Sequence, residues 1–276
     1  MQSAIILADA HVHFYQGFHL GLFLDQALKN FQLQGFRSFA GFLFLTEIKA
    51  DGWFQNYLRE LSGLKGEEKP FGAWSFHSTK EDYSLIAQSS PEEKLFIIAG
   101  RQIKSAENLE VLALGTLESF EEGRPVETLI GQINQAGALP VLPWGVGKWF
   151  GRRGNLVNKL VDKAEIRPLF LGDSGNRPVF WPRPTLFSKA EEKGMAVLPG
   201  SDPLPFPTEI NKVGRIGFKI EGVIDQEYPG RDIKKILLDP NKKPQTYGFL
   251  ETPFRFFRNQ LRMNLPAGKV LRHPGD

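Results

Sequence analysis

Three polar side chains, Asp9, His11 and His13, alternate at the end of the first apolar run of the 276-residue chain. Alternate side chains of a β-strand share one face, so we expect all three to point into the same space. Two imidazoles held two residues apart can bind one metal ion, and the carboxylate can add a ligand or orient an imidazole N–H. The pattern predicts a metal or catalytic site, and the alternative is a hydrogen-bonded structural cluster.

A second candidate follows a late apolar run, in the sequence Gly200-Ser201-Asp202-Pro203. A carboxylate at the end of a strand can ligate a metal or act as a general base on a water molecule. Ser-Asp-Pro is also common in turns and helix starts, which is the structural alternative for Asp202. Taken together with the first motif, Asp202 is predicted to face the same site.

The supply of ligands limits what such a site can be. The chain has no cysteine and five histidines, which excludes disulfides, thiolate zinc sites, iron–sulfur clusters and cysteine nucleophiles. A metal must be held by His, Asp or Glu. His19 is expected to cap a helix or orient a ligand, His77 falls in a predicted hairpin, and His273 lies near the C-terminal end. The sequence therefore predicts one metal ion at most.

Basic residues concentrate in the middle of the chain. Residues 145–185 hold eight Lys and Arg against three Asp and Glu. Two loops after predicted strands carry many of them, and we expect Lys148, Arg152, Arg153 and Arg177 to contact an anionic, phosphate-bearing substrate. The alternative is a solvated basic surface. Because the whole chain carries a formal charge of only +3 and shows no aromatic platform for bases, we expect a small anionic substrate and no nucleic acid.

Short apolar runs alternate with amphipathic stretches along the chain, which favours an α/β fold with a mainly parallel sheet. About seven such units favour a distorted TIM-like (βα)7 barrel over residues 1–225, with a hairpin insertion within 63–93. The strands are expected at 4–8, 39–45, 95–99, 109–114, 138–142, 168–171 and 195–198, with a further strand at 218–224. The helices are expected at 20–33, 51–61, 126–136, 156–164, 186–193 and 232–238.

Residues 226–276 are expected to form an extension that packs on the barrel. Thr252 and Pro253 begin a predicted amphipathic helix with Phe254, Phe257 and Leu261 on one side and Arg255, Arg258 and Arg262 on the other. We expect the aromatic side to lie on the barrel and the arginines in water. Contact with a membrane or RNA is the alternative. The first ten residues show no signal-peptide pattern and no run is long enough to span a membrane, so we expect a cytoplasmic protein.

Together these motifs resemble the PHP (polymerase and histidinol phosphatase) superfamily of metal-dependent phosphoesterases, which fold as a distorted seven-stranded βα barrel. His11 and His13 match its strand-end H-x-H, and 200–202 match its closing Gly-Ser-Asp. Residues 97–102, 110–115 and 137–143 echo the strands between, so the resemblance covers about residues 4–205. The amidohydrolase superfamily is similar in the same motifs but needs two further mid-chain histidines.

Several ligand positions depart from the PHP pattern. Glu47 follows Thr46 where the family has Asp-His, Gln102 replaces the bridging glutamate, Trp144 follows Pro143 where a histidine is usual, and Leu204 stands for the last histidine. The resemblance therefore implies one zinc, manganese or iron ion, held by His11, His13, Asp202, Asp9 and Glu47.

The function that this site implies is a metal-dependent hydrolase, most simply a phosphoesterase. Asp202 and Asp9 would be catalytic, with Gln102 and the basic loops toward the substrate. The alternatives are an amidohydrolase-like C–N or C–O hydrolase, and a degenerate barrel that binds an anionic metabolite or partner without turnover.

Overall fold

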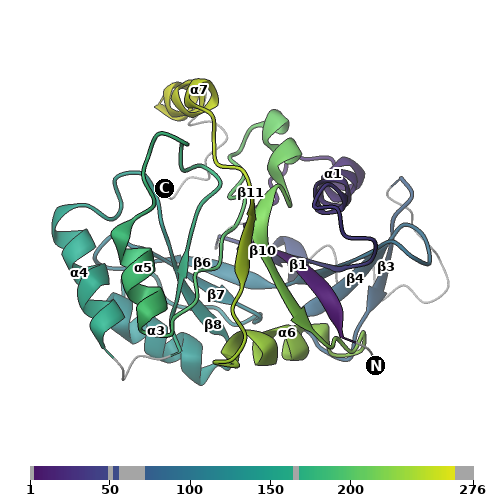
Figure 1. The fold of residues 1–276 in the computed structure, drawn as a ribbon, viewed down its shortest axis with the longest axis horizontal. Coiled ribbons are helices and arrows are strands. Elements are labelled where there is room, and N and C mark those ends of the chain that lie inside the picture. The colour runs from purple at the N-terminus through teal and green to yellow at the C-terminus, as the bar shows by residue number, and fades with distance from the viewer. Residues whose placement is uncertain (1–2, 49–51, 56–71, 164–167, 265–276) are drawn as a thin grey trace.

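A computed structural model describes residues 3–48, 52–55, 72–163 and 168–264. The fold is mixed α/β, with two β-sheets and helices around them (Figure 1). The α/β class expected from the sequence is confirmed. No helix in the described part is both long and apolar enough to cross a membrane.

The larger sheet has seven strands in the order β11-β10-β1-β2-β5-β4-β3. β1 is parallel to β2, and β2 is parallel to β5, while the outer strands pair antiparallel. The hairpin of β3 and β4 pairs with β5, so it extends this sheet. The strands span Ala4–Val12 (β1), Ala40–Leu45 (β2), Ser75–Ser78 (β3), Ser84–Gln88 (β4), Lys94–Ile98 (β5), Ile216–Gly222 (β10) and Gln245–Gly248 (β11).

The smaller sheet has four strands in the order β6-β7-β8-β9. β6 and β7 pair antiparallel, as do β7 and β8, and β8 and β9 are parallel. These strands span Gly100–Lys104 (β6), Glu110–Leu114 (β7), Leu139–Pro143 (β8) and Phe170–Gly172 (β9).

Backbone hydrogen bonds link the two sheets at two seams. At the first, the amide of Glu47 donates to the carbonyl of Gly100 (3.1 Å) and the amide of Gln102 donates to the carbonyl of Glu47 (2.9 Å). At the second, the segment 196–202 joins β9 to β1, where the amide of Ala10 donates to the carbonyl of Pro199 (3.2 Å). The strands of the described residues thus form two linked sheets, and the closed TIM-like barrel is not confirmed.

The expectation of a mainly parallel sheet is wrong. Among the described strands, six of the nine strand pairings are antiparallel. Short connections explain part of the difference, because only residues 105–109 join β6 to β7 and only 89–93 join β4 to β5. A parallel pair needs a crossover of about a dozen residues, so these connections are too short for one.

Helices pack on the outside of the sheets. Between the two sheets, buried side chains from both form one hydrophobic cluster, which includes Phe42, Leu112 and Phe170. The helix expected at 51–61 is described only at 52–55, and its remainder lies outside the described residues. The described helices are α1 (Leu20–Gln32), α3 (Val126–Gln135), α4 (Gly151–Asp162), α5 (Thr185–Glu192), a 3₁₀ helix η2 (Pro207–Lys212), α6 (Pro229–Leu238) and α7 (Pro253–Asn264).

Helix α7 lies at the top of the molecule in Figure 1. The side of α7 that faces the protein is not the expected aromatic side. Phe254 is 76% exposed, Phe257 58% and Leu261 68%, whereas Phe256 and Asn259 are buried. The expectation that the aromatic side lies on the barrel is therefore wrong. Asn259 explains the inward face, because its side-chain amide donates to the buried Glu209 carboxylate at 3.2 Å, and a buried carboxylate requires such partners.

Candidate metal site

His11 lies near the end of β1, and His13 follows the strand by one residue. Both side chains are buried, and their Nε2 atoms are 3.0 Å apart. The rings meet edge to face, with centroids 4.9 Å apart. The convergence of two ring nitrogens on one point is the arrangement that the His-x-His spacing predicts.

Asp202 reaches the same point from the other end of the chain. The segment 199–202 runs beside β1, and the amide of Asp202 donates to the carbonyl of His11 at 2.8 Å. Gly200 makes this approach feasible, since a β-carbon there would overlap the backbone nitrogen of His11. Asp202 has a φ of +47°, a left-handed conformation that Asp tolerates better than most residues. This turn directs its carboxylate toward the two histidines.

The three side chains fit one metal ion. The Asp202 Oδ1 atom is 3.7 Å from the Nε2 atoms of both histidines, and His11, His13 and Asp202 form a group whose ligand atoms all lie within 4.8 Å of one another. A triangle with edges of 3.0, 3.7 and 3.7 Å has a circumscribed radius of about 2.0 Å. Zinc bonds to nitrogen and oxygen are about 2.0–2.2 Å long, so one small divalent ion can contact all three atoms.

The protonation states suit ligands. Burial, and then the neighbouring His11 ring, lowers the pKa of His13 to about 3, so its imidazole is neutral near pH 7. Burial by itself would raise the pKa of Asp202. Attraction to His11, His13 and Lys148, together with a hydrogen bond from Ser174, outweighs that effect and lowers the pKa of Asp202 to about 2. A neutral imidazole and an ionised carboxylate are the forms that bind metals.

Two further side chains hold the cluster in place. The Ser174 hydroxyl donates to Asp202 Oδ2 at 2.9 Å, which leaves Oδ1 directed at the histidines. Gln102 Oε1 lies 3.0 Å from His11 Nε2. Gln102 comes from β6 of the smaller sheet, so this side chain brings the second sheet to the cluster. Because His11 Nε2 carries no hydrogen when it binds a metal, the position of Gln102 Oε1 suits a further oxygen ligand.

Asp9 is not brought into the cluster. Its Oδ1 accepts from the amides of Ser201 (2.8 Å) and His11 (3.3 Å), and its Oδ2 accepts from the amide of Gly214 (2.8 Å). The register of β1 against β2 shifts between Asp9 and Val12, and such an irregularity changes which face successive side chains occupy. Burial raises the pKa of Asp9 to about 6 despite these amides. Through these hydrogen bonds the Asp9 carboxylate links β1 to Ser201 and Gly214.

Glu47 also lies outside the group formed by His11, His13 and Asp202. Its carboxylate pairs with Arg101 at 3.0 Å and accepts from the amide of Phe54. Both carboxylate oxygens therefore have partners, and Glu47 holds the first seam between the two sheets.

The basic residues expected to bind substrate lie in different environments. Arg177 is buried and makes a two-pronged contact with Asp173 at 2.8 and 2.7 Å. Arg153 donates to backbone carbonyls, that of Gly147 at 2.7 Å, and Arg152 is exposed on α4. Lys148 pairs with Glu110 and lies on the wall of the cavity that contains Asp202. Of the four, Lys148 is thus the one that the structure brings to the cluster.

A cavity of about 240 Å³ opens beside the cluster. Asp202, Lys148 and Ser174 contribute polar groups to its wall, and the inner side of α7 closes it with Phe256 and Gln260. Asp202 is the metal ligand that lines this cavity, which is large enough for a small phosphoester.

A buried ionic network supports this wall, and sequence reasoning missed it. Lys212 is 4% exposed and contacts Glu209 (2.9 Å), Glu251 (2.5 Å) and the Asn176 side chain (2.7 Å). Asn176 in turn donates to the backbone carbonyl of Asp202 at 2.5 Å. The i,i+3 spacing of Glu209 and Lys212 is the one sequence signal that points to it, and that spacing alone is common on exposed helices.

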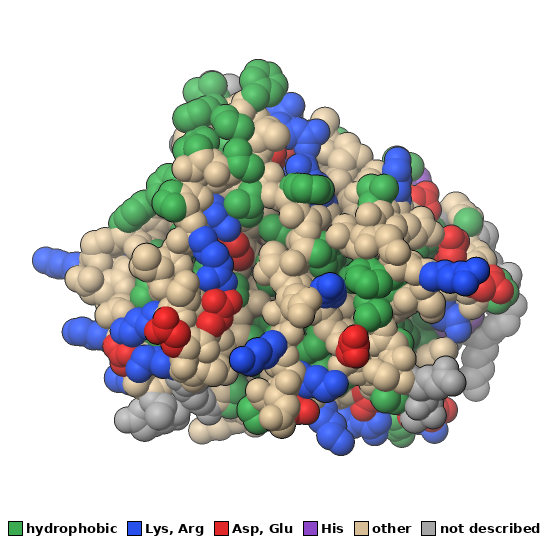
Figure 2. Space-filling model, in the orientation of Figure 1, with side chains coloured by type: hydrophobic (Ala, Val, Ile, Leu, Met, Phe, Trp, Pro, Cys, Tyr) green, Lys and Arg blue, Asp and Glu red, His purple; other side chains and the backbone are tan. Residues whose placement is uncertain are grey.

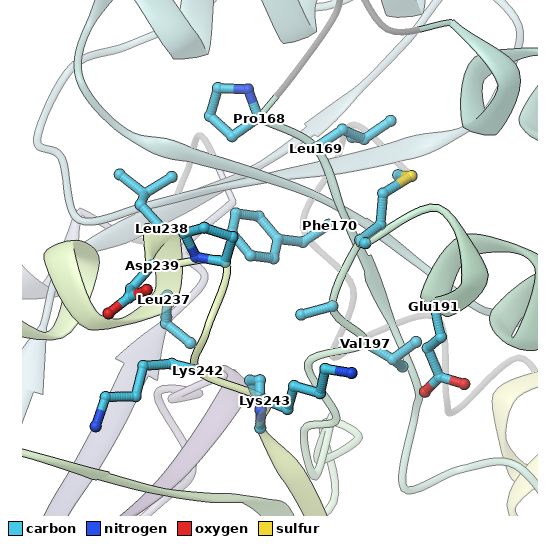
Figure 3. Close-up of a pocket in the computed structure, with 15 residues that line it drawn as sticks. Pro168, Leu169, Phe170, Glu191, Val197, Leu237, Leu238, Asp239, Lys242 and Lys243 are labelled. Atoms are coloured by element: carbon cyan, nitrogen blue, oxygen red, sulfur yellow. The ribbon is translucent and has the colours of Figure 1, made fainter.

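A second cavity, of about 540 Å³, is lined by none of the metal-ligand residues. It is lined at the start of β9 by Pro168, Leu169 and Phe170, and Lys242 and Lys243 stand at its edge (Figure 3). Met195, Ala196 and Val197 also line it, and Asp202 lies five residues further along the chain from Val197. The size of a cavity therefore does not locate the candidate site in this protein.

No protein-family model matches the chain, and no curated protein sequence matches it. The fold is shared with solved structures. PsfC from Pseudomonas syringae PB-5123 aligns with a TM-score of 0.58 and 16% identity, covering 95% of this chain and all of that one. Endonuclease Q from Pyrococcus furiosus, described as a lesion-specific endonuclease, aligns with a TM-score of 0.51 and 13% identity.

The match to Endonuclease Q covers 90% of this chain and 59% of the endonuclease, so the chain spans about three-fifths of its length. At these identities the comparisons show a common fold, and membership of the PHP superfamily stays a prediction from the motifs. The expectation that the protein has no nucleic-acid partner is wrong, because a protein of similar fold acts on nucleic acid: Endonuclease Q has been solved with a 27-mer duplex substrate that has an abasic lesion at the active site.

Proposed function

We propose that the protein is a metal-dependent phosphoester hydrolase whose single divalent ion is held by His11, His13 and Asp202. The observation that carries the proposal is the common point, about 2.0 Å from all three ligand atoms, that their separations define. The PHP-like motifs that contain these residues support the reaction class.

A divalent ion at this point would supply Lewis acidity, which polarises a phosphoryl oxygen and acidifies water. The chain's own groups have separate tasks. His11 and His13 supply neutral donors, Asp202 supplies the negative charge, and Ser174 fixes the carboxylate. Lys148, on the same cavity wall, places positive charge where a phosphate would enter, which favours an anionic substrate and its transition state.

The test measures metal content and turnover on the same preparations. Wild-type protein loaded with zinc or manganese is expected to hold one equivalent by mass spectrometry and to hydrolyse an aryl phosphate monoester or diester. His11→Ala and Asp202→Ala are expected to lose both properties. His77→Ala is the matched control, because His77 is an exposed histidine on β3, and it should change neither.

Two outcomes contradict the proposal. If the wild-type protein binds no metal after loading, it cannot be a metal-dependent hydrolase and the proposal fails. Protein that binds metal and hydrolyses aryl esters or amides, but no phosphoester, belongs with the C–N or C–O hydrolases instead.

A second candidate within the same chemistry is a nuclease. The observation that favours it is the common fold with Endonuclease Q. Cleavage of a labelled oligonucleotide that depends on His11 and Asp202 would support the nuclease, whereas turnover limited to small phosphoesters would contradict it.

A further inference from the structure

Helix α7 presents an exposed apolar stripe beside the candidate metal cavity. Phe254, Phe257 and Leu261 follow one another at helical spacing and are 76%, 58% and 68% exposed. Phe180, from the loop after β9, adds a ring that is 50% exposed. Figure 2 shows hydrophobic side chains gathered over α7 at the top of the molecule, with basic side chains beside them. Soluble proteins rarely expose an apolar patch of this kind without a partner for it.

The rings of this stripe are arranged for stacking. Phe180 and Phe257 lie nearly parallel, with an interplanar angle of 12° and centroids 5.8 Å apart. Phe256 supports both from below in edge-to-face contacts at 5.7 and 5.4 Å. Flat aromatic surfaces held by a second ring are suited to planar partners, and every nucleobase offers a planar face.

Arginines flank the stripe. Arg255, Arg258 and Arg262 lie along an adjoining side of α7, which contains no acidic residue. In the part of the chain that the structure describes, none of the three forms an ion pair with a carboxylate, and Arg262 lies 4.1 Å above the Phe206 ring. Three uncompensated guanidinium groups beside aromatic rings favour an anionic partner, and guanidinium groups pair well with phosphates.

The stripe is continuous with the candidate active site. The opposite side of α7 contributes Phe256, Asn259 and Gln260 to the cavity that contains Asp202. Trp144 lies on the same cavity wall, and its ring centroid is 5.7 Å from that of Trp181, the residue that follows Phe180 in the chain. A polymer lying on α7 would therefore run toward the metal ligands.

From this placement we infer that α7 and Phe180 bind single-stranded nucleic acid, with bases stacked on the phenylalanines and phosphates paired with the arginines. The inference rests on the proposed function, for which it names the substrate class. A second copy of the chain fits the surface less well, because antiparallel pairing of two α7 helices would gather six arginines on one side. A bilayer would use the apolar and basic groups, but it has no need of near-parallel rings or of the path to the cavity.

The test is binding of a short fluorescent oligonucleotide to metal-free protein, followed by fluorescence anisotropy. Phe254→Ala and Phe257→Ala are each expected to weaken binding about 5- to 150-fold, the range for loss of one base–aromatic stack. Arg255→Ala is expected to reduce the slope of log affinity against log salt by about 0.7, the contribution of one phosphate contact on a single strand.

Leu22→Ala and Leu33→Ala are the matched controls. Both residues are exposed apolar side chains at α1, 58% and 72% exposed, so their loss should leave oligonucleotide binding unchanged. Oligonucleotide affinity that is absent in the wild type, or that survives loss of both phenylalanines, overturns the inference. So does binding of anionic phospholipid vesicles that depends on the phenylalanines when the oligonucleotide does not bind.

The same variants separate this inference from the proposed function. His11→Ala is expected to lose metal and hydrolysis but to retain oligonucleotide binding. Phe254→Ala and Phe257→Ala are expected to retain one equivalent of metal. If the wild type binds no metal yet binds the oligonucleotide through the phenylalanines, the hydrolase fails and the nucleic-acid surface stands.

Discussion

Gly200 and His11 lie in backbone contact across the seam between segment 196–202 and β1, where no side chain fits at position 200. This contact brings together a histidine and an aspartate from opposite ends of the described chain. The geometry of the candidate metal site therefore depends on the absence of one methyl group.

Gly200→Ala is expected to displace segment 199–202 from β1 and to weaken metal binding by at least about tenfold, with a loss of about 1–3 kcal/mol in the free energy of unfolding. Metal titration and chemical denaturation measure the two effects. Gly131→Ala is the control, because Gly131 lies within α3 with open space around it. That change should stabilise the protein by about 0.5–1 kcal/mol. Unchanged metal affinity in the Gly200 variant would contradict the contact.

Ser174→Ala removes the hydrogen bond that holds Asp202 Oδ2. Partners of metal ligands typically contribute about 10- to 100-fold in metal affinity, and we expect a loss in that range with little change in thermal stability. Ser188→Ala, an exposed serine on α5, serves as the control. Equal metal affinities for the two variants would show that Ser174 does not position the carboxylate.

Lys212→Met leaves Glu209 and Glu251 buried without their cation. Breaking a buried ion pair costs about 3–5 kcal/mol, and we expect a loss of that size in the free energy of unfolding, measured by urea denaturation. Lys159→Met, at an exposed position of α4, should stay within about 0.5 kcal/mol of wild type. A combined Lys212→Met and Glu251→Gln change should recover part of the loss, because one unpaired charge is removed.

Metal removal should lower the melting temperature. A ligand present at about 100 times its dissociation constant stabilises the folded state by about 2.7 kcal/mol, so chelator-treated wild type should melt several degrees lower than protein with excess zinc. His13→Ala should show no such difference. An equal response of wild type and His13→Ala to metal would place the binding elsewhere on the molecule.

The sequence predicted the parts of this protein that are local. His11, His13 and Asp202 were identified because polar side chains directly after an apolar run mark the end of a buried strand. The positions of most helices follow from the periodicity of their apolar residues. Asp9 was placed with them because strict alternation was assumed along the strand. The irregularity between Asp9 and Val12 changes the face, and no residue type in that stretch signals it.

The long-range parts were not predictable in the same way. The antiparallel pairing of β10 with β1 joins segments more than two hundred residues apart, and nothing local to either strand specifies a direction. The outward turn of Phe254 and Phe257 was also missed. An amphipathic pattern identifies two sides of a helix, but the buried partner of Asn259 decides which side faces the protein.

The candidate site draws its residues from both sides of the two seams: His11 and His13 come from the larger sheet, Gln102 from the smaller, and Asp202 from the segment that joins them. Gln102 and Asp202 cannot reach the two histidines until both sheets have formed and docked, and the contact between Asp9 and Ser201 spans 192 positions. Closing so long a loop is slow relative to forming local contacts. Ligand capture should thus be among the last events of folding, and a nascent chain would remain unable to sequester metal until residue 202 had been synthesised.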